Sequence, residues 1–192
     1  SVEPEPTTPE QWFRTADRLG RRVELELACL HATAAAGPPP GEALLFVNVS
    51  PALLADPRSL ELRDQLPARL VLELTEREQV VDEEHLRAVL TPWLRTGARL
   101  AIDDAGAGYS SLKQVVALLP EFVKIDRSLI VGIHEDRNRQ ALVAALAAFA
   151  SQIGANLIAE GVESRAELAW LRDIDVDLVQ GYLLARPGEP WP

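Results

Sequence analysis

Cysteine is nearly absent from the chain, and its scarcity limits both the fold and the setting. Cys29 is the single cysteine in 192 residues, which excludes a disulfide framework and favours a reducing compartment. Because Cys29 falls within an apolar helical pattern, we expect an inert, buried thiol. The sequence also has no apolar run of about 18 residues and no opening signal-peptide pattern, so we expect a soluble cytoplasmic domain without membrane insertion.

Basic residues are also fewer than acidic ones. Nineteen basic residues stand against 29 acidic ones, the net charge is -10, and no basic run occurs. A surface for a nucleic-acid duplex is therefore not expected, although a small anionic ligand could be bridged to the acidic groups by cations. Apolar residues, in contrast, make up 47% of the chain, which fits one globular domain with a sizeable core.

The pattern along the chain predicts a short tail followed by one domain. Residues 1–10 are rich in Pro, Glu and Thr without periodicity and predict a tail or linker, so the domain is expected over residues 11–192. Helices are expected from Gln11 to Gly20 and from Val23 to about Ala36. Further helices are expected at about 83–96, 110–118, 138–153 and 165–172, with Asp82 as a cap and Pro92 as a kink or restart.

Six short apolar segments alternate with these helices, and each ends in a polar or charged group. The segments are 44–48, 69–73, 99–103, 122–126, 156–160 and 176–180, and the groups are Asn48, Glu73, Asp103 with Asp104, Lys124, Glu160 and Gln180. Alternating strands and helices predict an α/β fold with a parallel sheet. In a barrel of such units, the carboxyl ends of the strands meet on one face. Charges at the ends of buried strands are costly unless they are paired or ligated, so this repetition predicts an active site rather than ordinary loop starts.

Two of these groups, the Asp103–Asp104 pair and Lys124, indicate phosphodiester chemistry. Asp103 and Asp104 are adjacent carboxylates, which can clamp two hard cations about 4 Å apart, as in two-metal hydrolases. Lys124 stands between Val123 and Ile125, so strand alternation turns it toward the barrel axis. There it could orient or deprotonate a water molecule, or instead pair with Glu73 or Asp103 to neutralise a charged interior.

Other motifs carry less weight. Gly106-Ala-Gly108 lacks the third glycine of a dinucleotide fingerprint and follows two carboxylates that would repel pyrophosphate. Tyr109-Ser110-Ser111 is not a nucleophile elbow, and the three histidines fall in expected helices or at their ends. Trp93 is expected in the core.

Six ordered motifs carry a family resemblance. They are the stretches 46–50, 72–76, 101–112, 123–127, 158–163 and 179–182, which include Asn48, Asp103-Asp104, Lys124-Ile-Asp126, Ala159-Glu160-Gly161 and Gln180-Gly-Tyr182. In this order they resemble the EAL domains, which hydrolyse cyclic di-GMP.

The resemblance implies a modified TIM barrel that binds cyclic di-GMP and two Mg²⁺ or Mn²⁺ ions. It implies that Asn48, Glu73 and Asp103 ligate one cation and that Asp103, Asp104 and Glu160 serve the second. Lys124, Glu160 and Gln180 would take catalytic parts around the attacking water, and Glu163 would steady the loop after the Asp-Asp pair. The family also implies homodimers, and sensory or GGDEF-type domains on a full-length protein.

The chain departs from the family in two places. The family glutamate of Glu-Ala-Leu completes the first metal's shell from an early strand, and we expect that strand and its neighbour to be missing here, since six strands rather than eight are recognisable. Glu42-Ala-Leu44 spells the same letters but lies at the entry of the strand that ends in Asn48, so Glu42 should sit far from the metals. Ala105 and Ala107 replace a usual Phe and Thr. These departures leave two hypotheses, a phosphodiesterase and a catalytically impaired binding or regulatory module.

Overall fold

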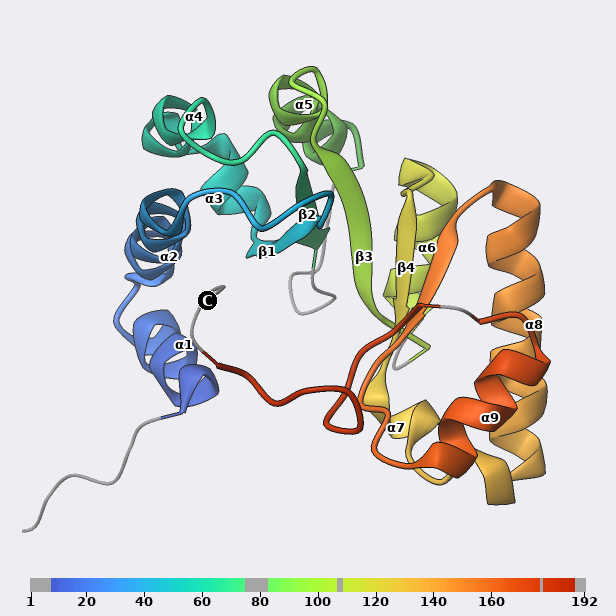
Figure 1. Cartoon of the computed structure of the whole chain (residues 1–192). Helices are drawn as coiled ribbons and strands as arrows, with labels where there is room; N and C mark the ends of the chain where they lie inside the picture. Colours follow the sequence, from blue (N-terminus) through green and yellow to red (C-terminus); the bar gives the residue numbers. More distant parts are fainter. Residues whose placement is uncertain (1–7, 75–82, 107–108, 177, 189–192) are drawn as a thin grey trace, which may run out of the picture.

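A curved parallel sheet of six strands forms the centre of the computed structural model, which describes residues 8–74, 83–106, 109–176 and 178–188. The strands follow the order of the chain, and each pairs in parallel with the next (Figure 1). They are β1 (Leu45–Val49), β2 (Leu70–Leu74), β3 (Arg99–Ala105), β4 (Phe122–Ile125), β5 (Asn156–Ala159) and β6 (Leu178–Val179). This confirms the predicted α/β class and the position of every predicted strand.

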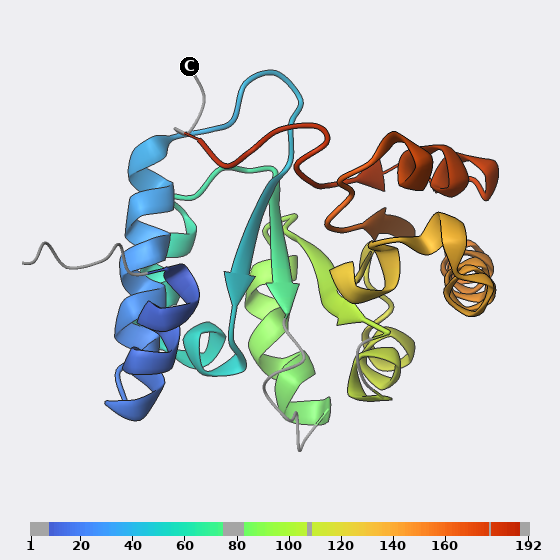
Figure 2. The ribbon, with the colours of Figure 1, turned by 90° about the horizontal axis from the view of Figure 1, so that it is seen from below.

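Helices cover the outer, convex face of the sheet, as Figures 1 and 2 show. The longer ones are α1 (Pro9–Arg18), α2 (Arg22–Ala36), α5 (Glu83–Leu94), α6 (Tyr109–Leu118), α8 (Arg137–Ile153) and α9 (Arg165–Asp173). Local signals fix their ends: Thr8 and Gln11 form a capping box at α1, Asp136 caps α8, and α8 ends at Gly154 with a positive φ of 74°. A proline-rich stretch follows α2 and prevents its continuation.

The strand pleat divides the core into two parts. On the outer face, residues such as Leu72, Ile102 and Ile125 pack with helix residues such as Trp93, which is fully buried as predicted. A smaller apolar cluster lies on the inner face. It consists of Val71, Ala101, Phe122 and Ile158, with Leu44 and Phe46 packed against them. Because successive side chains of a strand alternate between faces, the outer positions fix which residues point inward.

Several local details differ from the sequence-based expectations. Helix α1 begins at Pro9, inside the range expected as a tail, because Thr8 caps it and proline is favoured in a first turn. Helix α5 continues through Pro92 to Leu94 as one helix, and the expected cap Asp82 lies outside the described residues. Cys29 is exposed rather than buried, so the expectation of a core thiol was wrong: it lines a groove between α1, α2 and β1.

The connections also contain short helices that were not predicted from the sequence. These are α3 (Pro51–Ala55), α4 (Pro57–Arg63), α7 (Arg127–Ile130) and the 3-10 turn η1 (Ile133–Glu135). Helices of one or two turns lack a clear apolar period, but Ser50, Asp56 and Asp126 cap α3, α4 and α7 and gave a signal for each start.

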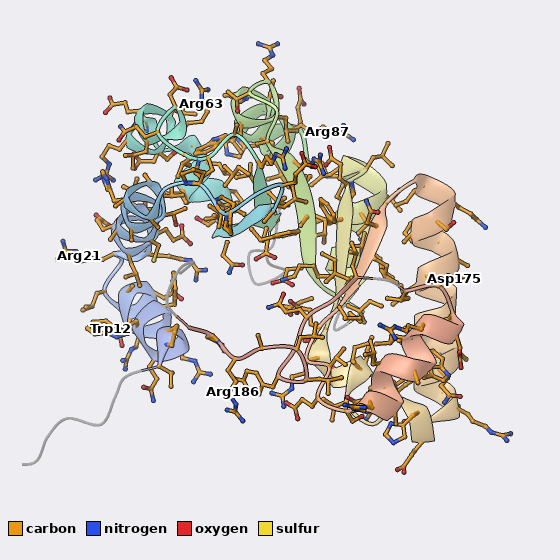
Figure 3. The ribbon with its side chains drawn as sticks, viewed as in Figure 1. Trp12, Arg21, Arg63, Arg87, Asp175 and Arg186 are labelled. Atoms are coloured by element: carbon orange, nitrogen blue, oxygen red, sulfur yellow. The ribbon has the colours of Figure 1, made fainter. Side chains whose placement is uncertain are left out.

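Strands β1 and β6 form the two edges of the described sheet. The segment after β6 runs across the gap between these edges toward α2 in both ribbon views, and in Figure 2 it reaches the carboxyl end of that helix (Figures 1 and 2). Figure 3 places Trp12 on α1 and Arg186 on the crossing segment. In the part of the chain that the structure describes, no helix has the length and apolar composition needed to cross a membrane.

Candidate active site

A polar layer lies directly above the inner apolar cluster, because the inward residue two positions further along each strand is polar. Phe122 is followed by Lys124, Val71 by Glu73, Ala101 by Asp103 and Ile158 by Glu160. All six strands carry such a group at or just beyond their carboxyl ends, namely Asn48, Glu73, Asp103, Lys124, Glu160 and Gln180. A side-chain period of two and a parallel sheet thus place six distant residues in one layer.

Lys124 lies at the centre of this layer. Its Nζ is 2.5 Å from Oε1 of Glu160, 2.7 Å from Oε1 of Glu73 and 3.3 Å from Oδ1 of Asp103. Lys124 is only 4% exposed and Glu73 only 6%, so these ion pairs are screened little by solvent.

The pKa values follow from this burial and pairing. Burial opposes the charge of Lys124, but the carboxylates of Glu73, Asp103 and Glu160 outweigh it and raise the pKa of the ammonium. Burial raises the pKa of Glu160 to about 6, where the Asp103 and Glu73 charges add to the effect and the Lys124 charge opposes it. The pKa of Glu73 is also raised, mainly by burial and against the charge of Lys124. The layer therefore holds more negative charge than one ammonium balances.

Asp103 and Asp104 both reach the site because β3 is irregular at its end. The register between β3 and β4 shifts between Ile102 and Ala105, and Asp104 has a positive φ of 56°. Its backbone N–H donates to Oδ1 of Asp103 at 3.0 Å. Bulges of this kind re-aim side chains, and strained backbone conformations cluster at functional sites.

This irregularity brings three carboxylates together. One oxygen each from Asp103, Asp104 and Glu160 lies within 4.8 Å of the others, and all three residues are partly exposed. These hard oxygen donors suit Mg²⁺ or Mn²⁺, so the donor chemistry fits the second cation site that the family resemblance implies. Glu73, expected to help with the first cation, is held by Lys124 in this structure.

Asn48 and Gln180 border the layer on opposite sides. Asn48 lies beside Glu73 in the β1–β2 register, and it lines a groove of about 580 Å³ together with Asp103, Asp104 and residues of α1 and α2. Gln180 lines a cavity of about 470 Å³ with Lys124, at the inner face near β6. The groove therefore opens onto Asp103 and Asp104, and the cavity opens onto Lys124.

Two further sequence expectations concern residues outside the layer. Glu42 is 91% exposed and pairs with Arg69 at 3.0 Å, at the amino-terminal side of β2 and away from the polar layer, as expected. Glu163, expected to steady the loop after Asp104, pairs with Arg127 at 2.6 Å. Its relation to that loop stays a prediction, because residues 107 and 108, Ala107 among them, lie outside the described part of the chain.

Glu167 was not predicted from the sequence: it is a 4% exposed carboxylate that accepts a hydrogen bond from the backbone N–H of Glu163. The pattern Ser164-x-x-Glu167 is a capping box and was available as a signal. Its wider contacts join residues far apart in sequence and could not be read from that pattern.

A parallel sheet with an acidic, lysine-containing layer at the carboxyl ends of its strands defines an α/β protein of the TIM-like barrel class with a cation-suited site. Comparison with protein families identifies the particular kind. The model described as the EAL domain matches residues 3–187, and the chain belongs to the EAL domain family.

Relatives within the family are similar over most of this chain. MucR of Pseudomonas aeruginosa, named a bifunctional diguanylate cyclase/cyclic di-GMP phosphodiesterase, is 34% identical over 146 residues, which cover 76% of this chain and 21% of MucR. The cyclic di-GMP phosphodiesterase PdeR of Escherichia coli is 34% identical over 148 residues, which cover 73% of this chain and 22% of PdeR. The chain therefore spans about a fifth of the length of these curated relatives.

Solved structures agree with this placement. BlrP1 of Klebsiella pneumoniae, in a complex with manganese and cyclic di-GMP, has a TM-score of 0.78 and 35% identity, covering 86% of this chain and 45% of that one. EAL domains form TIM-like barrels, and this similarity confirms the predicted fold class.

Proposed function

We propose that this chain hydrolyses cyclic di-GMP with two divalent cations, Mg²⁺ or Mn²⁺. The observation that carries the proposal is the group of carboxylate oxygens from Asp103, Asp104 and Glu160 within 4.8 Å of one another, with a buried lysine against it. The names of MucR and PdeR, and the bound manganese and cyclic di-GMP in BlrP1, support the same assignment.

The residues of the polar layer have distinct parts in this proposal. Asp103, Asp104 and Glu160 would hold one cation. Asn48, Glu73 and Asp103 would hold the other. Bound Mg²⁺ or Mn²⁺ would supply Lewis-acid polarisation of the phosphodiester and an activated water. Lys124 would orient such a water and balance negative charge, and the amide of Gln180, which lines the same cavity as Lys124, would donate or accept a hydrogen bond there.

A second candidate function is a module that binds cyclic di-GMP without cleaving it. The contacts of Lys124 favour this alternative, because its ammonium already neutralises part of the charge of Glu73, Asp103 and Glu160 without a metal. A layer maintained by ion pairs could persist in a chain that no longer turns over its ligand.

One experiment separates the two functions. Binding of cyclic di-GMP is measured by calorimetry in Ca²⁺, and product formation is followed by chromatography in Mn²⁺, with the same preparation. The phosphodiesterase proposal expects saturable binding and conversion to linear product. Binding of the same strength without product in Mn²⁺ or Mg²⁺ would instead establish the module.

We also propose that the domain works beside sensory or GGDEF-type domains in its full-length protein. The bifunctional name of MucR, and the small share of MucR that this chain covers, support that arrangement. Homodimerisation stays a prediction from the family.

A further inference from the structure

The carboxylate of Glu167 binds three backbone N–H groups from two separate segments of the chain. Its Oε1 accepts from the N–H of Gly132 at 2.9 Å, and its Oε2 accepts from the N–H groups of Glu163 and Ser164, each at 2.9 Å. A capping box needs only one of these bonds, the one from the N-cap residue Ser164. The other two join α9 to the turn before η1 and to the loop after β5.

The loop after β5 carries a residue of the polar layer. Glu160 begins it, and the N–H of Glu160 donates to the carbonyl of Ile125 in β4 at 3.2 Å. Glu167 holds the other end of the loop, at Glu163 and Ser164. The path of the chain from Glu160 to Ser164 is therefore fixed at both ends.

The middle of the same loop holds the segment that carries Gln180. The N–H of Val162 donates to the carbonyl of Gln180 at 3.0 Å, and the N–H of Leu183 donates to the carbonyl of Val162 at 3.1 Å. The approach is close, because a Cβ on Gly181 would lie 2.2 Å from the carbonyl oxygen of Val162. A displacement of Val162 therefore displaces Gln180.

The loop also rests on the segment after β4. The guanidinium of Arg127 pairs with Glu163, and a Cβ on Gly161 would lie 2.2 Å from Cγ of Arg127. Arg127 is exposed, whereas Glu167 is buried, so the bond of Glu167 to Gly132 is the better protected link between the two loops.

We propose that Glu167 is a positioning residue: by holding the loop 160–164 against Gly132, it places both Glu160 and Gln180 in the polar layer. The part of this inference that concerns turnover rests on the proposed function. The part that concerns the loop depends on the hydrogen bonds alone. A carboxylate with three backbone bonds can supply such a hold, since each bond to a charged acceptor is stronger than a neutral one.

The test compares Glu167→Gln with Ser164→Ala in the full 192-residue chain. Glutamine keeps one acceptor oxygen and the side-chain volume but cannot accept at both positions. Ser164→Ala removes the hydroxyl that caps α9 and leaves the carboxylate of Glu167 in place, so it serves as the matched control for a capping role.

Hydrogen exchange provides the first readout and needs no activity. Glu167→Gln should speed exchange of the amides of Val162, Gln180 and Leu183 at least tenfold, whereas Ser164→Ala should leave them near the wild-type rates. Equal effects of the two variants on these amides would overturn the proposal, because capping alone would then explain Glu167. If Glu167→Gln does not fold, Glu167→Asp, which keeps the charge on a shorter side chain, takes its place.

Turnover provides the second readout. At saturating cyclic di-GMP and Mn²⁺, Glu167→Gln should lower kcat about tenfold or more with KM changed less than threefold, since small misplacements of site groups lower the rate strongly. Ser164→Ala should retain the wild-type kcat. A wild-type chain without turnover would contradict the proposed function, and the exchange measurement would still decide the role of Glu167; faster exchange with an unchanged kcat would contradict positioning.

Discussion

At the scale of single residues, Lys124 is the one on which the site depends most. It contacts three carboxylates from three different strands, and it is buried. The sequence showed that Lys124 would face inward, because its neighbours Val123 and Ile125 belong to the outer core. Pairing with Glu73 or Asp103 was one of the alternatives drawn from the sequence, and the structure shows both pairs. The third partner, Glu160, was not predicted, because ion-pair partners depend on the distances between strand ends.

We expect Lys124→Ala to lower kcat about 10²-fold or more at saturating ligand, with a smaller change in KM, because its contact with the water matters mostly in the transition state. Steady-state kinetics in Mn²⁺ measure this, and Lys113→Ala, which removes an exposed lysine on α6, is the control. Weak binding with normal turnover at saturation would assign Lys124 to ligand binding instead.

The same substitution separates catalysis from folding. Removing the ammonium leaves the buried Glu73 and the partly buried Glu160 beside Asp103 without a counter-charge. Lys124→Ala should therefore lower the free energy of unfolding by about 3 kcal/mol in the absence of metal. Added Mn²⁺ should restore part of this loss. Urea titrations of both proteins with and without Mn²⁺ measure these changes in unfolding free energy. An unchanged stability would contradict the prediction and show that solvation or protonation of the carboxylates replaces the lost ion pairs.

At the scale of elements, alternation was the strongest signal in the sequence. It gave all six strands to within a residue or two, and it gave the inner polar positions, because a period of two is fixed by backbone geometry. The bulge at Asp104 was not predictable, since a register shift depends on the neighbouring strand. The contact of Glu167 with Gly132 was not predictable either, because it joins residues far apart in the sequence.

The loop between β5 and α9 should tolerate acid poorly. Burial works against ionisation of Glu167, but the N–H groups of Gly132, Glu163 and Ser164 stabilise the carboxylate and lower its pKa below the ordinary value of 4.5. A group with a lowered pKa in the folded state stabilises the fold above its unfolded pKa and loses that contribution as the pH falls through the folded value. The wild type should therefore lose stability below about pH 4.5, and Glu167→Gln should show a smaller loss. Urea unfolding between pH 3 and pH 6 checks this, and parallel profiles would refute it.

The contact between Gly181 and Val162 gives a second test of this loop. Gly181→Ala places a Cβ against the backbone of Val162, which cannot move aside like a side chain, so we expect a loss of about 2 kcal/mol in unfolding free energy. Gly188→Ala, at a position with open space around the added Cβ, should change it little. Urea denaturation compares the two, and equal stability would show that the two segments separate freely.

At the scale of the whole molecule, the sheet presents two edges, β1 and β6, with an inner apolar cavity between them. Leu178 and Leu184 line this cavity and are 41% and 57% exposed. The polypeptide studied alone should therefore associate with rising concentration, and replacing both leucines with Gln should reduce association. Sedimentation velocity over a range of concentrations measures this, and a wild-type monomer throughout would contradict it.

The convergence of the site is also a property of the whole molecule. Sequence reasoning placed the six polar groups on one face because parallel strands share a carboxyl end. The family resemblance already implied the grouping of Asp103, Asp104 and Glu160, and pairing of Lys124 with Glu73 was one of the alternatives for the lysine. The bulge in β3 that turns both aspartates to the site was not predictable from the sequence.

The most direct test of the account is cyclic di-GMP turnover as a function of free Mn²⁺, measured for the wild type, Asp104→Asn and the exposed-site control Asp173→Asn. The account predicts that wild type and Asp173→Asn are inactive in excess chelator and saturate with Mn²⁺. It predicts that Asp104→Asn, with its fold preserved, turns over at least about 10²-fold more slowly because it holds the cation poorly. Unchanged wild-type turnover in excess chelator, or full activity of Asp104→Asn, would contradict it.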